Sequence, residues 1–251
     1  MRYVTWFVLL AAVLGGDSAL AVGGLADVTI VDRNTGVALT PHYFRGEYWI
    51  AGSPGVRYAI EIHNRTGARL LAVTSVDGVN VISGETAGWG QSGYVFVPGQ
   101  GYQITGWRKS DAEIAAFTFT ALPDSYAALT GRPANIGVIG VAVFRERPPP
   151  VVSVPPRAQA AAPTSPPTAS ADSALKSEPE LGTGHGEREY SYVSHTEFRR
   201  MQEEPNEVIR IRYDSLEKLV AMGILRRPRP APMGADPFPA SAHHYVPDPP
   251  G

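Results

Sequence analysis

Three residues with oxygen-bearing side chains, Asp77, Asn80 and Glu85, lie close together in the stretch SVDGVNVISGETAGWGQSGYVF, residues 75–96. Carboxylate and amide oxygens are the ligands that calcium prefers, so these three residues are candidates for ligand binding. The segment DGVN nevertheless lacks the dense alternation of acidic residues found in calcium loops. Asp-Gly between two apolar runs is instead typical of a tight hairpin turn, which requires positive φ. The sequence therefore favours a turn and predicts no metal site.

Two tryptophans are the next candidates. Trp89 lies in the glycine-rich segment ETAGWGQSGYVF, and the later segment GWRKSD contains Trp107 followed by Arg108. An exposed Trp beside a charged residue can stack on a sugar ring or anchor a protein partner. The alternative is that both indole rings cover the ends of a β-sandwich core, because Trp is mostly buried on average. The sequence favours the second interpretation and leaves the first open.

No set of residues typical of an enzyme stands out. The chain has no cysteine and no G-x-S-x-G segment, and the adjacent His243 and His244 lack the spacing of a helical metal-binding pair. The segment GTGHGERE around His185 does not have phosphate-binding spacing, so we interpret it as a flexible hinge. We therefore expect a non-enzymatic protein without a cofactor. A hydrolase whose site is assembled from dispersed acidic and His residues is an alternative.

The elements that would position these residues are short β-runs between residues 26 and 147. In one of them Tyr58, Ile60 and Ile62 alternate with more polar residues, which indicates a strand with one face in a core. The turn NRTG after this run predicts an antiparallel hairpin with the next run, ARLLAVTSV. Eight or so such runs without a long amphipathic helix predict a mainly β fold, an antiparallel, jelly-roll-like β-sandwich. The apolar run at residues 136–144 is expected to be covered on both faces.

The composition changes at Pro148. Residues 148–180 are rich in Pro, Ala and Ser and predict a disordered linker, and residues 227–251 predict a disordered tail. Between them, residues 181–226 predict a small α+β module with strands in YSYVSHTEFRR and EVIRIRY and a helix in DSLEKLVAMGIL that Asp214 would cap. The module is too small to be a convincing independent domain, so we expect it to dock onto the sandwich or onto a partner.

The first 21 residues have the pattern of a secretory signal peptide. Arg2 is followed by an apolar run and then by Ala-Leu-Ala, and the run is too short to span a bilayer. We therefore expect a periplasmic or secreted protein that does not span the membrane after cleavage. The formal net charge of −2 gives no broad basic surface, so nucleic acid is not an expected partner.

Several segments resemble a family of exported proteobacterial proteins that has no established function. They are RGEYWIAGSPGVRYAIEIHN, SVDGVNVISGE, TGRPANIGVIGVAVF, GTGHGEREYSYVSHTEF and YDSLEKLVAMGIL. The resemblance implies export from the cytoplasm and a domain architecture, and it assigns no role to any residue. Our leading hypothesis is a non-enzymatic binding or scaffolding protein of the cell envelope, which presents its C-terminal module on the flexible spacer. Its partner would be an envelope protein or a cell-wall polysaccharide, and the alternative is a carbohydrate-binding module that uses Trp89 and Trp107.

Overall fold

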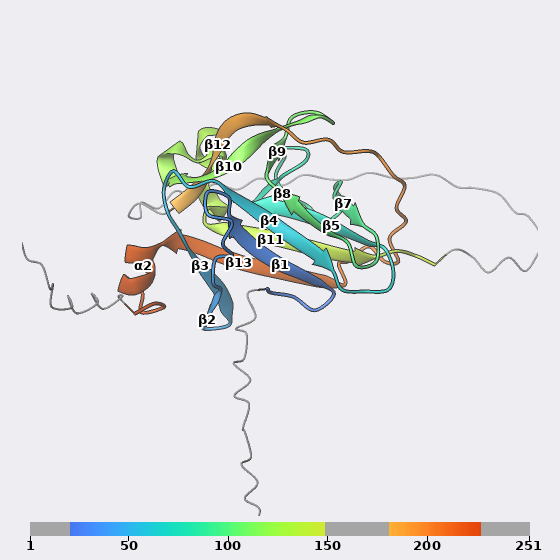
Figure 1. Cartoon of the computed structure of the whole chain (residues 1–251), viewed down its shortest axis with the longest axis horizontal. Helices are drawn as coiled ribbons and strands as arrows, with labels where there is room; N and C mark the ends of the chain where they lie inside the picture. The colour runs from blue at the N-terminus through green and yellow to red at the C-terminus, as the bar shows by residue number, and fades with distance from the viewer. Residues whose placement is uncertain (1–20, 149–180, 227–251) are drawn as a thin grey trace, which may run out of the picture.

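The computed structural model describes residues 21–148 and 181–226 (Figure 1). The predicted signal peptide, linker and tail, apart from Ala21 and Pro148, lie outside the described residues. The strands are β1 (Ala26–Asp32), β2 (His42–Phe44), β3 (Glu47–Gly52), β4 (Tyr58–Asn64), β5 (Leu70–Val76), β6 (Val79–Asn80), β7 (Tyr94–Phe96), β8 (Gly101–Ile104), β9 (Gly106–Arg108), β10 (Glu113–Ala121), β11 (Val138–Arg145), β12 (Leu181–Tyr190) and β13 (Glu207–Ser215). The helical segments are η1 (Leu122–Asp124), α1 (Tyr126–Leu129), η2 (Pro133–Asn135) and α2 (Leu216–Ala221).

The strands form three sheets, and the fold is mainly β as predicted. Two sheets have three strands each, in the orders β1-β4-β8 and β12-β10-β9. The large sheet has seven strands in the order β2-β3-β13-β11-β5-β6, with β7 also paired to β5. The strand pairs are antiparallel except for β13 and β3, which run parallel.

The two small sheets are joined edge to edge and together face the large sheet. The N–H of Phe119 in β10 donates to the carbonyl of Val56 just before β4 (3.0 Å). Ile60 from one small sheet, Phe117 from the other and Ile211 from the large sheet belong to one buried cluster. This shared core between two layers is the sandwich that the alternating sequence pattern predicts.

The predicted hairpin between β4 and β5 is wrong, because the two strands lie in different sheets. β4 pairs with β1 and β8, whereas β5 pairs with β11, β6 and β7. The buried side chain of Asn64, at the end of β4, explains the change of layer. Its Nδ2 donates to the carbonyls of Ala68, Phe96 and Val97, and its Oδ1 accepts from the N–H of Thr66 (2.8 Å). The segment after β4 is therefore held as a corner between the layers.

Residues 181–226 are part of the sandwich, which corrects the predicted boundary between a sandwich of 26–147 and a separate small module. β12 pairs along its length with β10, and β13 lies in the large sheet between β3 and β11 (Figure 1). The side chains of Ile209, Ile211 and Tyr213 point from β13 into the main core. The predicted helix is present as α2, but Ser215 and not Asp214 caps it, since the Ser215 Oγ accepts from the N–H of Lys218 (3.2 Å).

The segment GTGHGERE is strand β12 and not the predicted hinge. Its alternate glycines lie where the strand packs closely on its neighbours. A Cβ at Gly182 would come 2.5 Å from the Cβ of Ser125, and one at Gly186 would come 2.7 Å from the carbonyl oxygen of Ala116. Glycine is required here by a close approach and not by a need for flexibility.

Candidate functional site

Residues 191–200, which we call the strap, lead away from the end of β12 over the outer face of the large sheet. Figure 1 shows this segment in orange on the side of the molecule where β5 and β7 lie. The strand predicted in this segment is absent, because the strap pairs with its neighbours only through an isolated bridge between Arg200 and Glu146. Phe198 of the strap packs on an outer apolar cluster formed by Leu71, Val73, Ala142 and Phe144.

The first end of the strap is fixed by backbone and side-chain hydrogen bonds. The N–H of Ser191 donates to the carbonyl of Ala112 (2.7 Å), and the N–H of Val193 donates to that of Asp111 (2.9 Å). The guanidinium of Arg108 donates to the Ser191 carbonyl, and the hydroxyls of Ser191 and Tyr102 lie 3.2 Å apart. The loop before β10 and the end of β9 therefore hold this end.

Two arginines fix the second end. The Nη2 of Arg69 donates to the Thr196 Oγ1 (3.1 Å) and to the carbonyl of Glu197 (3.0 Å), while its Nη1 pairs with Glu146 (2.7 Å). The guanidinium carbon of Arg200 lies 4.3 Å from the centre of the Phe144 ring. The strap is therefore fixed at both ends.

A groove of about 890 Å³ lies between the strap and the segment that contains β7, and we call it the strap groove. Aromatic side chains are prominent in its lining: the rings of Tyr94 and Tyr102 lie 5.9 Å apart, and Tyr192 is 68% exposed. Polar side chains also belong to the lining. The remaining lining residues are Leu71, Ile82, Gly90, Gln91, Ser92, Gly93, Val95, Phe96, Gln100, Arg108, Asp111, Val193, Ser194, His195, Thr196, Phe198 and Arg200.

The charges of the groove are arranged around Arg108 and Asp111. The Nη2 of Arg108 donates to the hydroxyl of Tyr94 (3.1 Å). Burial raises the pKa of Tyr94, while Arg108 acts in the opposite direction, so this tyrosine is neutral at physiological pH. On the exposed side the Nε2 of His195 lies 3.1 Å from an oxygen of Asp111. The groove thus combines neutral rings, hydroxyls and amides with a few charges.

The chain matches no protein-family model, no curated protein and no solved structure. No helix in residues 21–148 or 181–226 is both long and apolar enough to cross a bilayer.

The two tryptophans have different environments. Trp107 is 3% exposed, its ring meets that of Phe117 edge to face at 5.2 Å, and its Nε1 donates to the carbonyl of Gly184 (3.4 Å). It is a core residue, as the alternative interpretation holds, and it does not reach the groove. Trp89 is 50% exposed and lies in the loop next to Gly90, which does line the groove. Arg108 is the predicted candidate that belongs to the groove itself.

Asp77 and Asn80 are buried and serve the structure. Asp77 and Gly78 have φ of 53° and 74°, which confirms the predicted hairpin turn between β5 and β6. The Asp77 carboxylate accepts from the N–H groups of Gly137 (2.9 Å) and Thr183 (2.8 Å) and from the hydroxyl of Tyr213. Burial raises its pKa to about 6 against these hydrogen bonds, which favour the ionised form.

Asn80 and Glu85 do not join Asp77 in a site. The Oδ1 of Asn80 accepts from the N–H of Ile82 (2.8 Å), which stabilises the turn after β6. Glu85 is exposed and accepts from Gln91 (3.3 Å). In the part of the chain that the structure describes, no three His, Cys, Asp or Glu side chains are grouped to hold a metal ion.

The sequence interpretation missed the tyrosines of the groove. Tyr94 and Tyr102 lie on two short strands of different sheets, and nothing in the sequence indicates that their rings meet. The density of hydroxyl-bearing residues in EREYSYVSHTEF was available as a signal for Tyr192. The alternation in this segment predicts a strand, whereas Tyr192 belongs to an extended segment without a partner strand.

Proposed function

We propose that the chain is an exported binding protein of the bacterial cell envelope, and that its strap groove binds a cell-wall polysaccharide. The observation that carries the proposal is the combination of three tyrosine rings with polar side chains in one open groove of about 890 Å³. Export is supported by the signal-peptide pattern of the first 21 residues.

The lining fits a sugar chain in two ways. A pyranose ring has apolar C–H faces that stack on aromatic side chains, and hydroxyls around its edge that need hydrogen-bonding partners. Tyr192 offers an exposed ring, and Tyr94 and Tyr102 form a ring pair in the same lining. The side chains of Gln100, Ser194 and His195 can exchange hydrogen bonds with hydroxyls.

A protein partner fits less well. An extended peptide binds by adding a strand to a free sheet edge, which requires unpaired backbone groups. The N–H groups of Ser191 and Val193 in the strap already donate within the chain. The apolar side chains of the outer cluster, which could anchor a peptide, are packed against Phe198 and Val95.

The position of β13 also changes the hypothesis of a module presented on a spacer. Because β13 lies between β3 and β11, residues 181–226 cannot leave the domain without opening the large sheet. The linker therefore connects two parts of one domain. The proposed binding site is the groove that the second part borders.

Binding to isolated peptidoglycan sacculi tests the proposal. The probe protein is the mature chain, residues 22–251, and its bound fraction is measured by co-sedimentation over a range of sacculus concentrations. Tyr192→Ala is expected to weaken binding about 3- to 10-fold, because one aromatic contact contributes about 0.5–1.5 kcal/mol. Tyr43→Ala is the matched control, because Tyr43 is also 68% exposed and lies on β2, away from the strap.

Three results would overturn the proposal. The first is a mature chain that does not sediment with sacculi. The second is an equal effect on binding of the variants at Tyr192 and Tyr43, which would place the contact outside the groove. The third is retention that disappears when attached proteins are stripped from the sacculi, which would identify a protein partner instead.

A further inference from the structure

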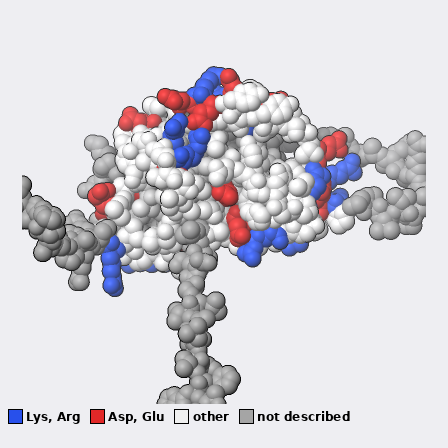
Figure 2. Space-filling model, in the orientation of Figure 1, with Lys and Arg blue, Asp and Glu red and all other residues white. Residues whose placement is uncertain are grey.

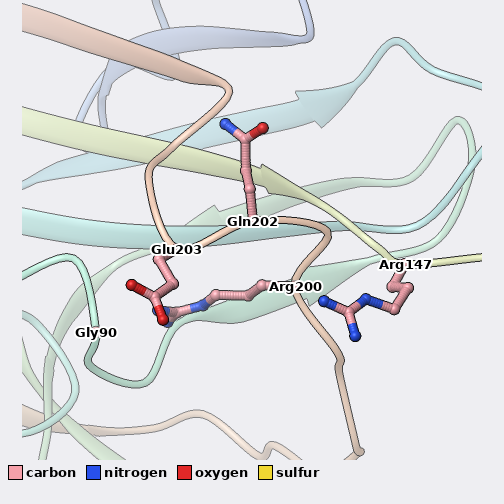
Figure 3. A pocket seen from close by; sticks show the side chains of 5 residues that line it. All are labelled: Gly90, Arg147, Arg200, Gln202 and Glu203. Atoms are coloured by element: carbon pink, nitrogen blue, oxygen red, sulfur yellow. The ribbon is translucent and has the colours of Figure 1, made fainter.

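A second hollow adjoins the strap groove and shares Gly90 and Arg200 with it. Its volume is about 400 Å³, and Arg147, Gln202 and Glu203 complete its lining. We call it the arginine pocket. Figure 3 shows the Arg200 side chain extending toward Glu203 and the Gly90 loop, with Arg147 on the other side of the Arg200 backbone. A chain in the strap groove that passes Gly90 reaches this pocket.

Arg200 is held in place by groups that do not neutralise it. Its Nη2 donates to the carbonyl of Gln91 (2.6 Å), and its guanidinium stacks on the ring of Phe144. No ion pair within 4.0 Å involves Arg200 among the described residues. Burial lowers its pKa, which indicates that the surroundings disfavour its charge. An arginine in this state gains from a negative charge brought by a ligand.

Arg147 is fixed by its backbone and presents a free side chain. Its N–H donates to the carbonyl of Arg199 (2.7 Å), and its guanidinium makes no ion pair with the described residues. Six of the fifteen arginines in the described residues pair with Asp or Glu: Arg33, Arg57, Arg65, Arg69, Arg188 and Arg212. Arg147 and Arg200 are among those that form no ion pair with the described residues, and the pocket brings these two guanidinium groups into one lining.

The charges around the pocket limit what it can bind. Arg147 and Arg200 with Glu203 give one net positive charge. Figure 2 shows that acidic and basic side chains are interspersed on the visible face, without a broad basic area that would attract a polyanion. A single negative charge matches this balance better than a doubly charged phosphate does. A carboxylate also fits the planar donor fork of arginine.

We propose that the arginine pocket binds a carboxylate carried by the glycan chain that occupies the strap groove. The inference rests on the proposed function and adds that the ligand is acidic. The groove supplies the stacking contacts, and the pocket selects chains that carry a carboxylate beyond the tyrosines. A neutral glycan is bound by the groove alone and therefore more weakly.

Chemical masking of the ligand tests this step. Sacculi are compared in their native form and after carbodiimide-mediated amidation, which converts carboxylates to neutral amides and leaves the glycan chain intact. The mature chain is expected to bind amidated sacculi about 10-fold more weakly, as for the loss of one charge-assisted hydrogen-bonded contact of about 1.4 kcal/mol. Arg200→Gln is expected to bind native sacculi as weakly as the wild type binds amidated sacculi. Amidation of the sacculi is expected to cause no further loss of binding in this variant.

Two further variants keep the test decisive. Arg147→Gln changes an exposed side chain and leaves the backbone contact with Arg199 in place, so it reports on the pocket if the change at Arg200 loosens the strap. Arg210→Gln removes the same charge from an exposed position on β13 and is expected to respond to amidation as the wild type does.

The outcomes separate this inference from the proposed function. Equal binding of native and amidated sacculi by the wild type, with the loss at Tyr192→Ala retained, overturns the acidic ligand and leaves the groove as a glycan site. An undiminished effect of amidation in both Arg200→Gln and Arg147→Gln also overturns it. Failure to bind either form overturns both proposals.

Discussion

Replacing Asp77 by asparagine is expected to remove a pH dependence from the stability of the fold. The Asp77 carboxyl is buried where β6, β11, β12 and β13 meet, and burial raises its pKa from the ordinary value of 3.8 to about 6. The folded protein therefore retains a proton between about pH 4 and pH 6 that the unfolded chain has lost. The contribution of this group to the free energy of unfolding is greatest below pH 4 and is lost as the pH rises through 6.

The size of the effect follows from the two pKa values. Their difference corresponds to about 3 kcal/mol between the acidic and the neutral limit. The asparagine side chain of the variant keeps a carbonyl that accepts from Gly137 and Tyr213, but its amide faces the N–H of Thr183. One buried N–H therefore loses its acceptor in the variant, which adds a pH-independent cost of about 1–3 kcal/mol to the pH-dependent difference. The informative quantity is the change of this difference with pH.

Urea unfolding at intervals from pH 4 to pH 7.5 measures how the stability difference between the wild type and Asp77→Asn changes with pH. The free energy of unfolding of the wild type minus that of Asp77→Asn is expected to fall by about 2.5 kcal/mol across this range, because the unfolded chain is already partly ionised at pH 4. Asp124→Asn, at an exposed position in η1, is the control for the loss of one carboxyl group. A difference that rises with pH would refute the reasoning, because the hydrogen bonds to the carboxylate would then outweigh its desolvation.

Three further predictions concern the fold and the strap. A chain without residues 181–226 is expected to be unfolded by circular dichroism and to regain strand signal when that segment is added as a separate peptide; a folded truncated chain would contradict the central position of β13. Trp107→Ala is expected to cost about 3–5 kcal/mol in urea unfolding and Trp89→Ala less than about 0.5 kcal/mol, and similar losses would argue against their different burial. Arg108→Ala is expected to speed amide hydrogen exchange in residues 192–198 while β11 and β13 stay protected; unchanged exchange there would show that the strap does not depend on this arginine.

The strands with a regular alternation could be predicted from the sequence because each has one face in the core. The run from Tyr58 to Asn64 and the strand from Glu207 to Ser215 both show this pattern, and both are strands in the structure. The Asp-Gly turn at residues 77–78 could be predicted for a local reason, its need for positive φ. Pairing partners could not, because the choice between sheets depends on contacts such as those of Asn64 that are distant in sequence.

β12 shows why a glycine-rich segment misleads. Alternate glycines at 182, 184 and 186 remove the apolar pattern and suggest flexibility, whereas two of them would bring a Cβ within 3.0 Å of a neighbouring atom. The groove could not be predicted from the sequence either, and the reason is related. Its tyrosines come from short strands in two sheets and from the strap, so their proximity results from the whole topology.

The contacts of Asp77 connect the two parts of the chain that the linker separates. Gly137, which donates to its carboxylate, precedes the linker, whereas Thr183 and Tyr213 follow it. Without residues 181–226 the Asp77 carboxylate would have no donors from Thr183 and Tyr213, and β3 and β11 would have no strand between them. β12 and β13 supply both the donors and the missing strand. The strap follows β12 directly, so the wall of the proposed binding groove belongs to the part of the chain that completes the sandwich.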